Sequence, residues 1–213
     1  MGKIMVVGQA GHEYSPDICM IDMEVRITRK TASEASIACT ARCEQLLKKL
    51  KEELGIDPSS IEQYSDRISR ESDYHSNEVY YESRKSMCLY IPTNMRIVNT
   101  IRSIIGMGFE DVSFSTNYLV SNEEELNKEL LKEAIADSRG RAELLAESMG
   151  LKITGVDSAD LSGKEDVYDL TEESERGLVR YKMSADGANS FSDQLKPEQI
   201  ELSSKVKIVW LVE

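Results

Sequence analysis

Residues 134–150 read AIADSRGRAELLAESMG, and this stretch decides the fold. Its apolar side chains recur at intervals of three and four residues, which is typical of one face of an α-helix. Extended backwards, the pattern predicts a helix over residues 121–149 that Gly150 ends. Asp137 and Arg141 lie one turn apart, so an ion pair is expected between them. The expected buried face consists of Leu126, Leu130, Ala134, Ile135, Leu145, Ala146 and Met149.

Upstream, residues 18–28 read ICMIDMEVRIT and alternate strictly between apolar and polar side chains over most of their length. Asp22, Glu24 and Arg26 fall on one side, and the apolar odd-numbered residues fall on the other. A period of two is typical of a β-strand with one solvated face. The pattern therefore predicts an antiparallel sheet that is covered by helices on its apolar face.

The rest of the chain supplies further elements around these two. We expect strands at residues 3–11, 111–120, 151–161 and 201–212, a long hairpin over 61–91, and helices over 31–54 and after Pro92. Residues 18–120 then have the order β-α-β-β-α-β, a split-βαβ arrangement. The predicted fold class is α+β, with a mostly antiparallel sheet, helices packed on one face, and a third long helix over that sheet or over a neighbouring subunit. One domain is expected over residues 1–213.

Residues 162–197 are the least regular part, rich in Asp, Glu, Ser, Gly and Lys. We interpret them as a long acidic excursion. Its carboxylates could hold Ca²⁺ or Mg²⁺, but the EF-hand spacing is missing, so a solvated loop is the favoured interpretation.

The charge balance excludes some classes of function. The chain has 26 Lys and Arg against 38 Asp and Glu, a net charge of −12. Nucleic acids and anionic membranes both require clustered basic residues, so neither is an expected partner. No apolar run approaches the roughly 20 residues that cross a bilayer, and residues 1–11 do not resemble a leader, so a cytoplasmic location is expected.

No catalytic, cofactor-binding or metal-binding residue is predicted. The four cysteines, Cys19, Cys39, Cys43 and Cys88, form no CxxC motif. Cys39 and Cys43 lie four residues apart, which could suit a metal, but they share the apolar stripe of a helix and are expected to be buried hydrophobes. The two histidines, His12 and His75, fall in predicted turns, and no Gly-rich phosphate-binding motif occurs.

Five tyrosines lie in or beside the predicted long hairpin, namely Tyr64, Tyr74, Tyr80, Tyr81 and Tyr90. Tyrosine is enriched in protein interfaces because it combines a large apolar body with a polar tip. Cross-strand packing inside one subunit is an equally good interpretation. These residues are the candidate interface.

The stretch quoted at the start also resembles the signature helix of the SIMPL domain family. That family shows the pattern Ala-x-x-Asp-Ala-Arg-x-Lys-Ala-x-x-Leu-Ala-x-x-Leu-Gly, and Ser138 and Met149 are departures from it. The residues that fall in register are Ala134, Asp137, Arg139, Ala142, Leu145, Ala146 and Gly150. Pattern-level similarity extends over nearly the whole chain. The resemblance implies an α+β fold without a catalytic motif, homo-oligomers, binding of protein partners, and export in many bacterial members.

Three hypotheses follow for function. The first is a non-enzymatic, self-associating SIMPL-type protein that uses the hairpin and the acidic excursion for contacts. The second is a monomeric adaptor or ligand-binding module for a protein partner. The third is a metal-dependent hydrolase built on the acidic excursion.

Overall fold

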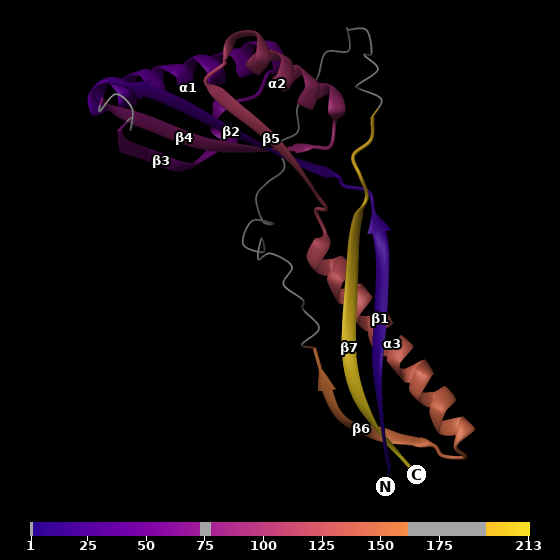
Figure 1. The fold of residues 1–213 in the computed structure, drawn as a ribbon. Coiled ribbons are helices and arrows are strands. Elements are labelled where there is room, and N and C mark those ends of the chain that lie inside the picture. Colours follow the sequence, from indigo (N-terminus) through magenta and orange to yellow (C-terminus); the bar gives the residue numbers. More distant parts are fainter. Residues whose placement is uncertain (1, 73–77, 162–194) are drawn as a thin grey trace. The chain divides into compact units, whose positions relative to one another are not determined.

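The structure is a computed structural model that describes residues 2–72, 78–161 and 195–213. The contacts between residues divide the chain into two compact units. The larger unit is built on residues 16–119, and the smaller unit is built on residues 2–15, 120–161 and 198–213. Each unit contains its own antiparallel sheet and its own buried core (Figure 1). The α+β class is confirmed, and the single domain expected over residues 1–213 stays a prediction.

The larger unit holds a four-stranded sheet in the order β3-β4-β2-β5. Its strands are β2 (Ile18–Arg29), β3 (Ile61–Ser72), β4 (Val79–Pro92) and β5 (Val112–Leu119). Two helices, α1 (Ala32–Leu54) and α2 (Met95–Gly108), lie over one face of this sheet (Figure 1). A short 3-10 turn, η1 (Pro58–Ser60), precedes β3. The expected β-α-β-β-α-β core is confirmed here.

Local sequence explains where α1 begins and ends. Thr31 caps its start, where the Thr31 hydroxyl accepts the Glu34 N–H at 3.2 Å. Gly55 ends it with a φ of 68°, in the left-handed region that glycine adopts without strain. The buried side chains of α1 are Ala35, Cys39, Cys43, Leu46 and Leu50. Cys39, Cys43, Leu46 and Leu50 belong to the same core cluster as Ile21, Met23 and Leu89 of the sheet.

The smaller unit holds a three-stranded sheet in the order β1-β7-β6. Its strands are β1 (Gly2–Tyr14), β6 (Ile153–Asp160) and β7 (Ile200–Val212). The first and last strands of the chain pair in unbroken antiparallel register, from Gly2 opposite Val212 to Tyr14 opposite Ile200. The helix α3 (Glu123–Ser148) runs along β1 and β7 and covers one face (Figure 1).

This arrangement corrects the expected position of the third helix, which was placed over the first sheet or a neighbouring subunit. The helix α3 instead covers a second sheet within its own chain. The physical reason is the pairing of β1 with β7. These segments lie at opposite ends of the sequence, and no local pattern shows that two such distant strands form a ladder.

The buried face of α3 also differs from the expected one. Ile135, Leu145 and Met149 are exposed, although they were expected in the core. The buried positions recur every four residues, at Leu130, Ala134, Ser138, Ala142 and Ala146. Four of these five side chains are small, so the helix backbone approaches the sheet closely. The bulkier side chains of Ile135, Leu145 and Met149 lie beside this stripe and do not pack against the sheet.

Candidate functional site

A close contact between α3 and β1 explains the small residues of the signature helix. A Cβ atom built on Gly8 would lie 1.9 Å from the Ala134 carbonyl oxygen and 2.7 Å from the Ser138 Cβ atom. Only glycine therefore fits at this point of β1. The buried indole N–H of Trp210 donates to the Ser138 hydroxyl at 3.2 Å. Ser138, a departure from the family pattern, thus supplies the acceptor that a buried Trp side chain requires.

Asp137 and Arg141 bind the free edge of β1, and we call this pair the edge clamp. The Asp137 carboxylate accepts the Gln9 backbone N–H at 3.0 Å. Arg141 donates to the Val7 carbonyl at 3.4 Å and to the Asp137 carboxylate at 3.0 Å, which confirms the expected ion pair. The Gln9 N–H, followed by Arg141, holds the pKa of Asp137 below its ordinary value.

The other signature residues lie partly against the sheet and partly on the exposed side of the helix. Ala134, Ala142 and Ala146 are buried against the sheet. Arg139 pairs with Glu143 at 2.9 Å on the exposed side of the helix. Gly150 ends the helical segment with a φ of 68°.

The uncovered face of the four-stranded sheet is polar, and we call it the polar face. A shallow hollow of about 250 Å³ lies on it, lined by Asp22, Met23, Glu24, Tyr64, Ser113, Phe114 and Ser115. The Tyr64 hydroxyl donates to the Asp22 carboxylate at 3.3 Å. Burial, followed by the Asp22 charge, raises the pKa of Tyr64. Most ligand pockets for small molecules are larger, at about 300–1,000 Å³.

Charged side chains of alternating sign lie next to this hollow. Glu24 accepts from Arg26 at 2.8 Å, and the Arg26 Nε atom lies 3.8 Å from the Glu82 carboxylate. Arg84 pairs in turn with Glu82. The hydrogen bond from Arg26 lowers the pKa of Glu24, and the charges of Arg26 and Arg84 add to the shift. In contrast, no Lys or Arg of the described residues forms an ion pair with Asp22.

The face of the three-stranded sheet opposite α3 carries apolar side chains. Met5 and Val7 point away from the helix and are 60% and 48% exposed. Val209 is paired with Met5, and Leu211 lies two residues further along the same face of β7. We call these four residues the outer patch. Sequence reasoning missed it, although the signal was present: apolar residues at both odd and even positions of β1 and β7 indicate two apolar faces.

The candidate tyrosines do not gather at one place. Tyr64 is 61% exposed on the polar face, whereas Tyr90 is only 8% exposed. Tyr80 and Tyr90 lie ten residues apart on β4, a separation of about 33 Å along a strand. Tyr80 and Tyr81, being adjacent, point to opposite faces, and Tyr74 lies outside the described residues. Their part in an interface stays a prediction.

The cysteines and the described histidine show no catalytic arrangement. All four cysteines are buried, which confirms that Cys39 and Cys43 belong to the core. Burial raises the pKa of Cys19 to about 11, and burial together with Cys39 raises the pKa of Cys43 to about 12. His12 lies 2.8 Å from Glu133 at the exposed surface. His75 and nearly all of the acidic excursion lie outside the described residues.

Within the described ranges, no three side chains of His, Cys, Asp or Glu are grouped so that they could hold a metal ion. No helix in these ranges is both long and apolar enough to cross a membrane.

Comparison with known proteins identifies the family. No curated protein matches the chain. The family model SIMPL, described as "Protein of unknown function (DUF541)", matches residues 4–210, almost the entire chain. The match covers both sheets, the signature helix and the edge clamp. The chain therefore belongs to the SIMPL family of proteins of unknown function.

Proposed function

We propose that this protein has no catalytic activity and associates with further copies of itself through the outer patch. The observation that supports this proposal most strongly is the apolar composition of the sheet face that α3 leaves uncovered. Antiparallel sheets that face water usually carry polar side chains on that side. Here Met5 and Val7, midway along the edge strand β1, are 60% and 48% exposed on that side. Contact with an equivalent face would remove this apolar surface from water.

Charged residues at the margin of the patch support pairing of two copies. Lys3 and Lys207 lie on the same face, next to the apolar residues in the register of β1 and β7. Lys3 forms an ion pair with Asp157 of β6 at 2.7 Å. The face therefore offers both signs of charge around an apolar centre, which suits a symmetric interface.

A non-catalytic role fits the chemistry of the described residues. Raised pKa values keep Cys19 and Cys43 protonated, so neither provides a thiolate nucleophile near neutral pH. The hollow on the polar face is small and open. Four buried thiols also favour a reducing compartment, and we therefore include a cytoplasmic location in the proposal.

Sedimentation equilibrium of two matched variants tests the proposal. Val7→Lys places a charge in the outer patch and is expected to leave the chain at its monomer mass of 24.0 kDa. Ile37→Lys is the control, because Ile37 is a single exposed side chain on α1, 68% exposed and remote in sequence from the patch. This control is expected to associate like the wild type. Equal masses for the two variants would rule out the outer patch as the interface.

A further inference from the structure

Each sheet ends in two edge strands, and an uncovered edge strand pairs readily with another chain. Proteins block such edges with charges, bulges, proline or a covering element. The four edges of this protein, β1, β6, β3 and β5, can be compared directly. Three of these edge strands have a feature that hinders pairing with another chain.

Two of the blocked edges belong to the three-stranded sheet. On β1, the edge clamp binds the outward-facing Gln9 N–H and Val7 carbonyl. On β6, the register with β7 shifts between Ile153 and Gly155 and again between Val156 and Ser158. Bulges of this kind bend an edge strand and disrupt pairing.

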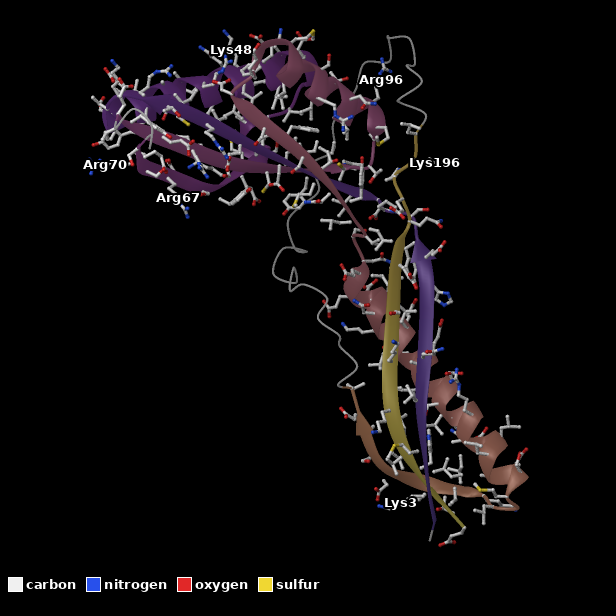
Figure 2. All side chains as sticks on the ribbon, viewed as in Figure 1. Lys3, Lys48, Arg67, Arg70, Arg96 and Lys196 are labelled. Carbon is white, nitrogen blue, oxygen red and sulfur yellow. The ribbon has the colours of Figure 1, made fainter. Side chains whose placement is uncertain are left out.

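The third blocked edge is β3. Its register with β4 shifts between Gln63 and Ser65. Charged residues follow along the strand, and Figure 2 shows Arg67 and Arg70 projecting from it. Charges along an edge discourage the approach of a further strand.

Within the described part of the chain, the fourth edge, β5, has none of these features. Residues 112–119 read VSFSTNYL, without a charge, a proline or a glycine. The strand pairs with β2 in unbroken register from Val112 to Leu119. No described strand pairs with its other side.

The register shows which backbone groups of β5 point outward. The Arg26 N–H donates to the Asp111 carbonyl at 2.9 Å, so odd-numbered residues of β5 form the ladder with β2. The N–H and C=O groups of Phe114, Thr116 and Tyr118 therefore face the free edge. Because they alternate along the strand, they can bind one further extended segment in antiparallel or parallel register.

The side chains around β5 indicate which types of residue such a segment would contain. On the polar face, Ser113 and Ser115 are small and exposed, and they line the hollow that contains Asp22. A strand added beyond β5 would lie two strand spacings from Asp22, about 10 Å away. A long basic side chain crossing the serines can reach this carboxylate. On the opposite face, half-buried Phe114 and Tyr118 would contact apolar side chains.

We infer that β5 is a docking edge for an extended segment of a partner protein in which Lys or Arg alternates with apolar residues. Backbone hydrogen bonds to β5 provide affinity, and the Asp22 carboxylate with the Phe114 and Tyr118 rings provides selectivity. The site lies in the larger unit, whereas the outer patch lies in the smaller one. The two proposals are therefore independent.

A basic partner segment fits better than a second copy at this edge. The β5 strand of a second copy contains no Lys or Arg to meet Asp22. Charge complementarity therefore favours a partner of different sequence, consistent with the net charge of −12. Residues 178–183 of the chain, which lie outside the described part, read LVRYKM and also alternate in this way. They are a competing occupant that the experiment must distinguish.

A short fluorescein-labelled peptide in which valine alternates with arginine probes the edge. Fluorescence anisotropy should show binding to the 213-residue chain, and a peptide with glutamate in place of arginine should not bind. Amide hydrogen exchange should then show new protection at Phe114, Thr116 and Tyr118. Ser113, Ser115 and Asn117, already in the ladder with β2, should change little.

Matched variants separate the two parts of the recognition. Thr116→Pro removes an outward N–H and should weaken binding about tenfold or more, whereas Thr116→Ala keeps that N–H and should bind normally. Asp22→Asn should weaken binding of the arginine peptide about two- to fivefold. Glu71→Gln, at the far end of β3, should have no effect.

Several results would overturn the inference. Failure of the arginine peptide to bind, or equally tight binding of the acidic peptide, contradicts the inference. It is also contradicted if Thr116→Pro, shown by circular dichroism to be folded, binds the peptide as tightly as the wild type. New amide protection at another edge strand instead of β5 would contradict it as well. Binding that appears only after deletion of residues 178–183 would assign the edge to the chain itself and not to a partner.

Discussion

The carboxylate of Asp137 accepts the backbone N–H of Gln9 at 3.0 Å, across 128 positions of sequence. This bond joins the signature helix to the free edge of the first strand. It gives the Asp of the family pattern a structural role, because an unpaired edge N–H would otherwise attract other strands. Asp137→Ala, which removes the acceptor, should therefore increase the amide exchange rate of Gln9 about tenfold or more. Glu143→Gln, on the exposed side of the same helix, is the control, and equal exchange rates in both variants would contradict this role.

The clamp also has a consequence for acid stability. The pKa of Asp137 is lowered in the folded protein, chiefly by the Gln9 N–H and then by Arg141. A carboxylate with a lowered folded-state pKa stabilises the fold above its unfolded pKa of about 3.9, and this contribution is lost as pH falls through the lower folded value. Thermal unfolding from pH 7 down to pH 2 should show a smaller acid-dependent loss in Asp137→Asn. Parallel curves for the wild type and the variant would be inconsistent with the clamp.

Among the described glycines of the smaller unit, Gly8 is predicted to be the least replaceable. Gly8→Ala places a methyl group against the Ala134 carbonyl oxygen, so strand and helix must separate. We expect a loss of about 2–3 kcal/mol in the free energy of unfolding, measured by urea denaturation. Gly140→Ala is the matched control on α3, where a new Cβ meets nothing within 4 Å. It should stabilise the protein by up to about 1 kcal/mol. A Gly8→Ala variant as stable as the wild type would contradict the close contact.

The hydrogen bond between Trp210 and Ser138 predicts a compensating pair of substitutions. Ser138→Ala leaves the buried indole N–H without its acceptor, which should cost about 1–3 kcal/mol. Trp210→Phe removes the donor, so adding Ser138→Ala to that background should cost much less. A double-mutant cycle from urea denaturation measures the difference. Additive losses would show that the hydroxyl and the indole do not depend on each other.

The cysteines should be unreactive in the folded protein. With pKa values of about 11 and 12, Cys19 and Cys43 carry almost no thiolate at pH 8, and both are buried. A chromogenic disulfide reagent should modify them only after denaturation in guanidinium chloride. Rapid modification of either residue in the native protein would contradict both the burial and the raised pKa.

Local patterns in the sequence were sufficient to predict the position and type of most helices and strands. The strict alternation of β2 predicted its buried face at Cys19, Ile21 and Met23, because a strand with one covered face requires a period of two. Thr31 and Gly55 predicted the two ends of α1, since capping depends on a few adjacent residues. The α+β class and the split core followed from the order of these elements.

Long-range pairing and close packing were not predictable in the same way. Nothing local in β1 indicates its pairing with β7, so the second sheet was not foreseen. The buried stripe of α3 was misjudged because hydrophobicity favoured Leu145 and Met149, whereas the approach of Gly8 requires small side chains. The open edge of β5 depends on what lies beside that strand, which a single sequence does not contain. The two apolar faces of the second sheet, in contrast, could have been inferred from the apolar residues at both odd and even positions of β1 and β7.

Light scattering of the wild-type chain over a range of concentrations tests self-association most directly. The account predicts a molar mass that rises above the 24.0 kDa of one chain as the concentration increases through the micromolar range. A mass that stays at 24.0 kDa at every concentration would contradict it.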